Sequence, residues 1–214
     1  MENEFLTLAA SGDAETRIKA SVFLAHAAPV ASAEEARSEI EAWSRPYFDA
    51  THHCTAWRLH DGVWRVNDDG EPSGSAGAPI LAAIDGAGLT DCVVIVTRYY
   101  GGTKLGVGGL VRAYGEAAAL ALAAAPRRRG VRALRLRVRY PYELTSPVMR
   151  VLEQVGAREV EHGFDASGAG GVVEFSVARD AEARVGELLT EWTSAAVSPE
   201  PLGEQVLYEG ADNS

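Results

Sequence analysis

A glycine-rich segment that contains basic residues is the strongest candidate for binding chemistry in this sequence. Five of the nine residues at positions 101–109 are glycine, and basic residues lie within and beside them. The segment follows a β-branched run and precedes an alanine-rich one, so we expect it to join a strand to a helix. Free backbone amides and the dipole at a helix start favour a bound anion. The predicted anion- or RNA-binding residues are Arg98, Lys104, Gly106, Gly108, Gly109 and Arg112.

The spacing of the glycines does not match the two common nucleotide-binding loops. A dinucleotide fingerprint needs a third glycine, but the stretch that begins at Gly106 ends in Val111. A Walker-type phosphate loop needs Gly-Lys-Ser/Thr, but Lys104 stands between Thr103 and Leu105. The sequence therefore argues against nucleotide hydrolysis and dinucleotide redox chemistry, and we predict no cofactor. A glycine turn with a purely structural role remains the alternative.

A second candidate loop, residues 67–79, is rich in acidic and small residues. Asp69 and Glu71 in this loop, together with His52, are the candidate catalytic residues, because carboxyl and imidazole groups can transfer protons. Asp, Gly, Pro and Ser are also the ordinary residues of turns. The spacing of a calcium loop is absent, and no Cys-x-x-Cys pair accompanies Cys54, so no metal site is predicted. We expect Cys54 to be a buried structural thiol.

The net charge of the chain is −10, but the charges are distributed unevenly. Residues 92–142 contain ten basic residues and one acidic residue, whereas the remainder contains ten basic and 29 acidic residues. This balance argues against a wholly basic nucleic-acid binder, although one basic face could still attract a polyanion. The alternative is that the arginines are spread over solvated surfaces.

Targeting and redox features favour the cytoplasm. The first residues are acidic and lack the long apolar core of a signal peptide, and we find no apolar run of membrane-spanning length. The two cysteines form neither a ligand cluster nor a disulfide framework, so we expect them to be reduced. We therefore expect a cytoplasmic protein without a membrane partner.

Apolar periodicity and turn residues predict an α+β fold. A strand over residues 16–30 would place Ile18, Val22 and Leu24 on one face. The Ser-Ala-Glu-Glu stretch that follows starts a helix with a capping box. The next elements expected are a hairpin, a short helix, a strand, a longer helix and a linker, at residues 52–70, 79–84, 91–100, 110–124 and 127–130.

The second half of the chain has a pattern of its own. From Arg132 onwards, the expected order of elements is β-α-β-β-α-β, which is typical of a ferredoxin-like sandwich with both helices on one face of an antiparallel sheet. The first of these strands would carry Arg135, Arg137 and Arg139 on one face, with apolar residues on the other.

Three long motifs resemble one known family. The stretches THHCTAWRL, DDGEPSGSAGAPIL and VTRYYGGTKLGVGGLVRAYGEAA, in this order, resemble the IMPACT family and in particular its bacterial YigZ-like members. The resemblance covers roughly residues 17–124. It implies an N-terminal IMPACT domain at residues 1–128, similar to domain 2 of ribosomal protein S5, with a four-stranded sheet on two helices. It also implies a ferredoxin-like C-terminal domain at residues 131–210, similar to one in elongation factor G.

The resemblance also carries functional expectations. Eukaryotic relatives regulate translation by interfering with the activation of an initiation-factor kinase. The chain is therefore expected to be a translation-associated regulatory protein, more a binding protein than an enzyme. It would bind RNA, the ribosome or a translation factor through the glycine-rich loop. Tyr99, Tyr100 or Tyr114 could stack on bases, and the three strand arginines could extend the surface.

Two other functions stay open. The chain could be a protein-interaction module without RNA contact that docks through its acidic surface. It could instead be an enzyme acting on an anionic, phosphorylated small molecule, with Asp69 and Glu71 as acid–base groups. That activity requires the two candidate loops to share one pocket. The sequence predicts neither the partner nor the oligomeric state.

Overall fold

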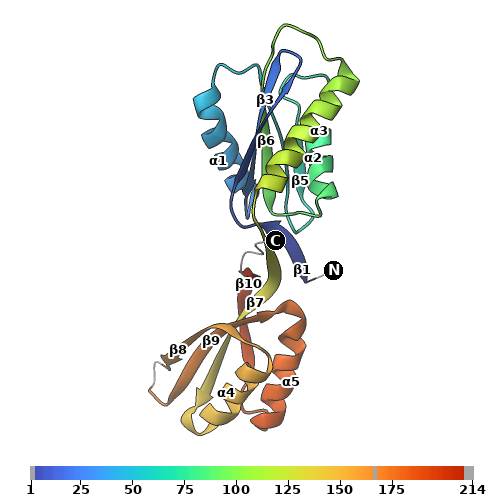
Figure 1. Ribbon diagram of the computed structural model, residues 1–214. Helices are drawn as coiled ribbons and strands as arrows, with labels where there is room; N and C mark the ends of the chain where they lie inside the picture. The colour runs from blue at the N-terminus through green and yellow to red at the C-terminus, as the bar shows by residue number, and fades with distance from the viewer. Residues whose placement is uncertain (1–2, 166–167, 210–214) are drawn as a thin grey trace. The chain divides into compact units, whose positions relative to one another are not determined.

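The computed structural model describes residues 3–165 and 168–209, which form an α+β protein of two compact units (Figure 1). The N-terminal unit comprises residues 5–129 and 209, and the C-terminal unit comprises residues 3–4 and 130–208. Each unit has its own sheet and its own apolar core, and the described residues form five α-helices and two sheets in all.

The N-terminal unit is an antiparallel sheet with helices on both faces, in the strand order β2-β3-β6-β4-β5. Its strands are β2 (Gly12–Ile18), β3 (Ser21–Pro29), β4 (His52–Arg58), β5 (Trp64–Asn67) and β6 (Cys92–Tyr99). Its helices are α1 (Ala33–Ser44), α2 (Gly77–Gly86) and α3 (Val107–Ala124). The sheet described in this unit thus has five strands and is covered by three helices, where the family resemblance implied four strands and two helices.

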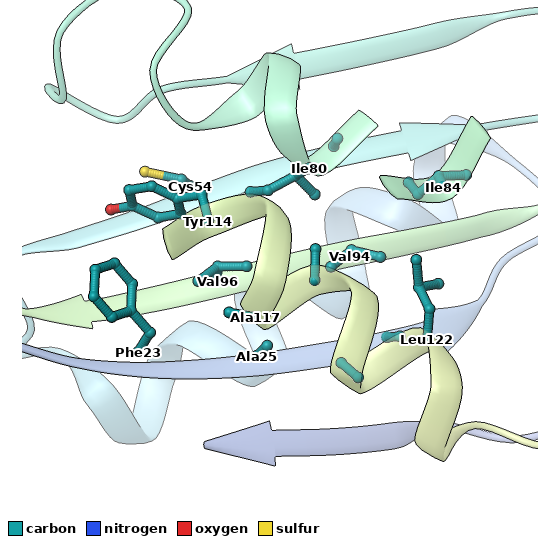
Figure 2. Packing of buried hydrophobic residues seen from close by; sticks show 14 of the residues in the cluster. Phe23, Ala25, Cys54, Ile80, Ile84, Val94, Val96, Tyr114, Ala117 and Leu122 are labelled. Atoms are coloured by element: carbon teal, nitrogen blue, oxygen red, sulfur yellow. The ribbon is translucent and has the colours of Figure 1, made fainter. Parts of the chain in front are cut away.

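The alternation of apolar residues in β6 explains why both faces of this sheet are covered. Val94 and Val96 join the core beneath α2 and α3, whereas Val93 and Ile95 pack beneath α1 on the opposite face. A strand buried on both faces has a continuous apolar sequence, as β6 does. Figure 2 shows side chains from β3 and β6 facing those of α2 and α3, among them Tyr114.

The prediction of one strand over residues 16–30 was wrong, because this stretch is the hairpin of β2 and β3. A two-residue turn at Lys19 and Ala20 joins the strands, and Ile18 pairs with Ser21. Lys19 adopts a left-handed φ of 54°. The turn inverts the alternation, so Ile18 lies on the face of the buried Phe23 rather than on the face of Val22 and Leu24.

The second sheet lies mainly in the C-terminal unit; β1-β7-β9-β8 form one path in it, and β10 also pairs with β7. Residues 5–8 of β1 and 127–129 of β7 belong to the N-terminal unit. The strands are β1 (Glu4–Leu8), β7 (Arg127–Pro141), β8 (Arg158–Phe164), β9 (Gly170–Ala178) and β10 (Pro199–Tyr208). Helices α4 (Thr145–Gln154) and α5 (Glu182–Trp192) supply the rest of its core. The order β7-α4-β8-β9-α5-β10 is the predicted one, but the predicted linker at 127–130 is the start of β7.

Helix α3 is longer and more apolar than the sequence led us to expect. By length and composition alone its 18 residues could cross a membrane, which corrects the expectation that no segment reaches that length. The buried residues of α3 account for this composition, since they form its contact with the sheet. They are Leu110, Ala113, Tyr114, Ala117, Ala118, Ala121 and Leu122.

Candidate functional site

A cavity of about 450 Å³ in the N-terminal unit brings the two candidate loops together. Its polar lining comes from the start of β4, the loop before α2, the end of β6 and the glycine-rich loop. These polar residues are Thr51, His52, Glu71, Arg98, Tyr100 and Lys104. Pro72, Leu105, Val107 and Leu110 add apolar surface, and Gly106 completes the lining. Of the predicted site residues, Asp69, Gly108, Gly109 and Arg112 lie outside it.

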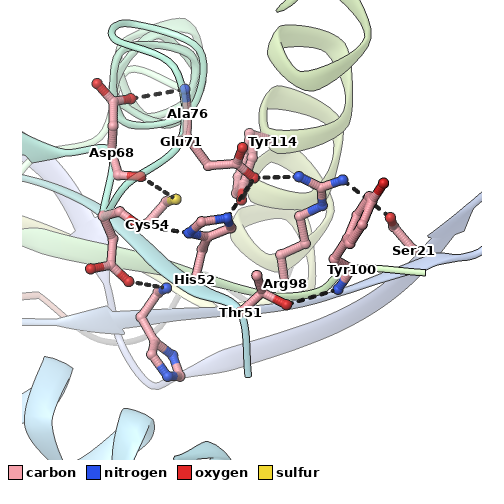
Figure 3. A network of polar contacts seen from close by, with 12 residues as sticks. Ser21, Thr51, His52, Cys54, Asp68, Glu71, Ala76, Arg98, Tyr100 and Tyr114 are labelled. Carbon is pink, nitrogen blue, oxygen red and sulfur yellow. Dashed lines mark hydrogen bonds and ion pairs between the residues drawn. The ribbon is translucent and has the colours of Figure 1, made fainter. Parts of the chain in front are cut away.

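The floor of the cavity is a buried ion pair between Arg98 and Glu71 (Figure 3). The Nη1 of Arg98 donates to Oε1 of Glu71 at 2.5 Å, and its Nη2 donates to the Ser21 hydroxyl at 3.2 Å. The Tyr114 hydroxyl donates to the same carboxylate oxygen at 2.8 Å. Burial raises the pKa of Tyr114, so this hydroxyl keeps its proton and remains a donor.

This network changes the role predicted for Arg98. The side chain is 5% exposed and its charge is balanced by Glu71, so Arg98 is not a free phosphate contact. Its guanidinium also lies over the rings of Phe23 and Tyr100, 5.5 and 5.3 Å from their centroids. Arg98 therefore positions Glu71 and supports the floor of the cavity.

Asp68, next to the predicted Asp69, holds the loop that carries Glu71. One carboxylate oxygen accepts hydrogen bonds from the amides of Ala76 and Gly77, and the other accepts from Gly74. Partial burial alone would raise the pKa of Asp68, but these three backbone amides outweigh it and hold the pKa below its usual value. The charge of Asp68 thus fixes this loop, and sequence reasoning gave no sign of that role.

His52 has a fixed orientation at the edge of the cavity. Its Nδ1 lies 2.7 Å from the carbonyl oxygen of Asp69, and its Nε2 lies 3.8 Å from Oε1 of Glu71. The Asp69 carboxylate accepts a 2.6 Å hydrogen bond from the backbone amide of His53, so it is engaged in holding the strand. Among the described residues, no three His, Cys, Asp or Glu side chains are grouped to hold a metal ion.

The glycine-rich loop delivers the start of α3 to the cavity. Gly106 precedes the helix with a φ of 71°, a conformation that favours glycine, and no side chain caps the first turn. The first amides of α3 therefore lack helical acceptors. Lys104 is exposed beside them, and the Lys19 ammonium lies 3.4 Å from its carbonyl oxygen. The sequence did not point to Lys19, because only the β2–β3 hairpin brings it to this loop.

Several other residues predicted to contact RNA lie in surroundings that differ from the predicted ones. Tyr114 is buried and cannot stack on a base, and the Tyr99 hydroxyl donates to Asp49 at 2.8 Å. Tyr100 is 43% exposed, so it is the tyrosine best placed to stack. Arg112 is exposed on α3, outside the cavity lining. The three arginines predicted on one face of a strand all form ion pairs within the C-terminal unit. Arg135 pairs with Glu161, Arg137 with Glu174 and Arg139 with Glu200.

The two cysteines are expected to be almost unreactive in the folded protein. Both side chains are buried, and burial raises each pKa to about 12. The Cys54 thiol also donates to the Asp68 carbonyl at 3.1 Å. Because the thiolate is the reactive form, a rise of this size lowers its amount at pH 8 by roughly 1000-fold. Titration with Ellman's reagent in buffer and in guanidinium should show slow and fast reactions, respectively. Rapid reaction of either thiol in buffer would contradict this burial.

Comparison with known proteins places the cavity inside a recognised domain. The family model for the Impact N-terminal domain matches residues 19–122, which include every residue that lines the cavity. The IMPACT family member YvyE of Bacillus subtilis is 41% identical over 118 residues, which cover 54% of this chain and 54% of that protein. This chain carries the Impact N-terminal domain of the IMPACT family. The family motifs identified in the sequence thus build the cavity.

Other IMPACT relatives agree with this assignment, and one solved structure shares the fold. A family member from Thermus thermophilus is 54% identical over 110 residues, 51% of this chain and 59% of its own length. YigZ of Escherichia coli is 43% identical over 102 residues, 46% of this chain and 50% of its own. The chain thus matches about half the length of these relatives. A crystal structure of a hypothetical protein, 26% identical, has a TM-score of 0.69 and covers 95% of this chain and 99% of its own.

Proposed function

We propose that this protein is a translation-associated regulatory protein that binds RNA through the cavity, either free or on the ribosome. The proposal rests on one observation: Lys104 and the uncapped start of α3 lie side by side in the lining of the cavity. The helix start and the ammonium would bind a phosphate group. The exposed Tyr100 would offer a stacking surface for a base at the rim of the same cavity.

Salt dependence tests this proposal directly. A labelled eight-nucleotide RNA should bind the wild-type protein more weakly as salt increases, because each phosphate contact releases counterions. Lys104→Ala should reduce the slope of log affinity against log salt by roughly 0.7, as expected for one contact to a single strand. Fluorescence anisotropy at several salt concentrations measures both quantities.

Arg184→Ala provides the matched control for this experiment. Arg184 is a half-exposed arginine on α5 that pairs with Glu187, so the substitution changes the net charge equally at a site outside the cavity. The control should keep the wild-type slope. RNA affinity that is absent or independent of salt would refute the proposal, and an equal loss in both variants would refute the role of Lys104.

An enzymatic function is the second candidate, and one observation favours it. The loop of Glu71 and the glycine-rich loop do line one cavity, with the His52 imidazole beside Glu71. A phosphorylated small molecule bound there would have an acid–base group next to its phosphate. Turnover of a phosphate ester that is lost in His52→Gln would favour this candidate over simple binding. Asp69 is not among the lining residues, so Glu71 and His52 are the residues to test.

We also infer that the C-terminal unit is a ferredoxin-like domain and that the N-terminal unit is related to domain 2 of ribosomal protein S5. The first inference is supported by the strand order β10-β7-β9-β8 in an antiparallel arrangement, with α4 and α5 packed in the same core. The second rests on the family resemblance. We propose residues 1–128 and 131–210 as the two domains, and the cytoplasm as their location.

A further inference from the structure

We infer that His52 recognises a ribose hydroxyl group, so that the cavity selects RNA over DNA. The inference rests on the proposed RNA-binding function and deepens it by assigning a specificity determinant. Its starting point is the hydrogen bond between Nδ1 of His52 and the carbonyl oxygen of Asp69, at 2.7 Å. A carbonyl oxygen can only accept, so Nδ1 carries the hydrogen, and the neutral ring has its lone pair at Nε2.

The Nε2 atom of His52 is available to a ligand. It lies 3.8 Å from Oε1 of Glu71, which is too long for a hydrogen bond. That oxygen already accepts from the Arg98 guanidinium at 2.5 Å and from the Tyr114 hydroxyl at 2.8 Å. Figure 3 shows the imidazole beside the Glu71 carboxylate, with the Arg98 guanidinium on the opposite side of that carboxylate. A ligand hydroxyl fits this position, because it can donate a hydrogen bond to the lone pair of Nε2.

The Nε atom of Arg98 is buried without a hydrogen-bond partner, although both Nη atoms of the same guanidinium are bonded. Because this atom has almost no exposed surface, a ligand in the cavity cannot contact it. The partly exposed His52 is therefore the side chain that determines which polar group of a ligand is recognised.

Phosphate and hydroxyl recognition occur within one cavity of suitable size. The volume of about 450 Å³ lies within the range of roughly 300–1,000 Å³ that is typical of small-ligand sites. Lys104 and the start of α3 would hold the phosphate, and His52 would contact the sugar. The 2′-hydroxyl is the group by which proteins distinguish RNA from DNA. A ribose phosphate unit satisfies both contacts, whereas a deoxyribose unit leaves Nε2 of His52 unpaired.

The test compares RNA and DNA oligonucleotides of one sequence, with a third oligonucleotide that carries 2′-O-methyl groups. The wild-type protein should bind RNA roughly 3- to 10-fold more tightly than DNA, the effect of one hydrogen bond. The 2′-O-methyl strand, which cannot donate, should bind like DNA. His52→Phe should lower RNA affinity to the DNA level and leave DNA affinity unchanged.

His53→Phe is the matched control, because His53 lies on the other face of β4, where its Nδ1 contacts the Thr97 hydroxyl at 2.9 Å. This variant should keep the preference for RNA. Equal wild-type affinity for RNA and DNA would overturn the inference while leaving polyanion binding intact, and binding of neither would overturn both. The 2′-O-methyl comparison uses the wild-type protein, so the outcome stands even if His52→Phe does not fold. Selective competition by uridine 5′-monophosphate over its deoxy analogue would support the ribose contact with a free nucleotide.

Discussion

Replacing Arg98 by methionine is expected to lower the free energy of unfolding by about 3–5 kcal/mol. The substitution keeps an apolar stem over Phe23 but leaves the Glu71 carboxylate, whose side chain is 4% exposed, without its cation. Tyr114 alone would then donate to it. An unpaired buried charge costs far more than the loss of an exposed ion pair. Equilibrium unfolding in urea, followed by tryptophan fluorescence, measures the change.

Two further variants decide whether the buried charge is the cause. Arg98→Met combined with Glu71→Gln removes both charges and should recover most of the lost stability. Arg37→Met breaks an ion pair with Glu34 in which the two side chains are 63% and 75% exposed, and should cost less than about 1 kcal/mol. A loss below about 1 kcal/mol in Arg98→Met would show that the Glu71 carboxylate is solvated in the folded protein. If the double variant does not recover stability, the loss in Arg98→Met comes from disturbed packing rather than from the buried charge.

Local patterns predicted most of the fold but little of the polar network. The β-branched run of β6 and the alanine-rich α3 were recognisable because each is a long segment with one clear pattern. The strand alternation also contained an unused signal, since Arg98 falls on the same face of β6 as Val94 and Val96. An arginine on a core face needs a buried acidic partner. The partner, Glu71, is 27 positions away, so the sequence alone could not identify it.

The two turns that shape the site explain the remaining errors. The β2–β3 turn contains Lys19 and Ala20, without the glycine, asparagine or proline that usually marks a turn. Because this turn was not predicted, the approach of Lys19 to the glycine-rich loop was not predicted either. In the acidic loop, turn residues were expected, but the carboxylate of Asp68 was not distinguishable from that of Asp69. Only the folded loop shows that Asp68 binds three amides while Asp69 supports β4.

Substituting Gly101 by alanine is expected to destabilise the protein by roughly 2–4 kcal/mol, because the site has no room for a methyl group. A Cβ atom there would lie 1.8 Å from the carbonyl oxygen of Ala20 and 2.1 Å from its carbonyl carbon. Both are backbone atoms, so no side-chain rotation can relieve the clash. Either the end of β6 or the β2–β3 turn must move. Urea unfolding measures the loss of stability.

The shift caused by Gly101→Ala should also weaken RNA binding, because the end of β6 and the β2–β3 turn both contribute residues to the site. The amide of Gly101 lies 3.4 Å from the Ser21 hydroxyl, which also accepts from Arg98, and Lys104 follows three residues later. Gly102→Ala is the matched control: no atom lies within 4 Å of its added Cβ, and only its φ of 81° is unfavourable. This unfavourable backbone conformation should lower the stability of Gly102→Ala by about 1 kcal/mol and leave its RNA affinity near the wild-type value. Equal losses in the two variants would mean that glycine is needed here for backbone freedom rather than for the close approach of the β2–β3 turn.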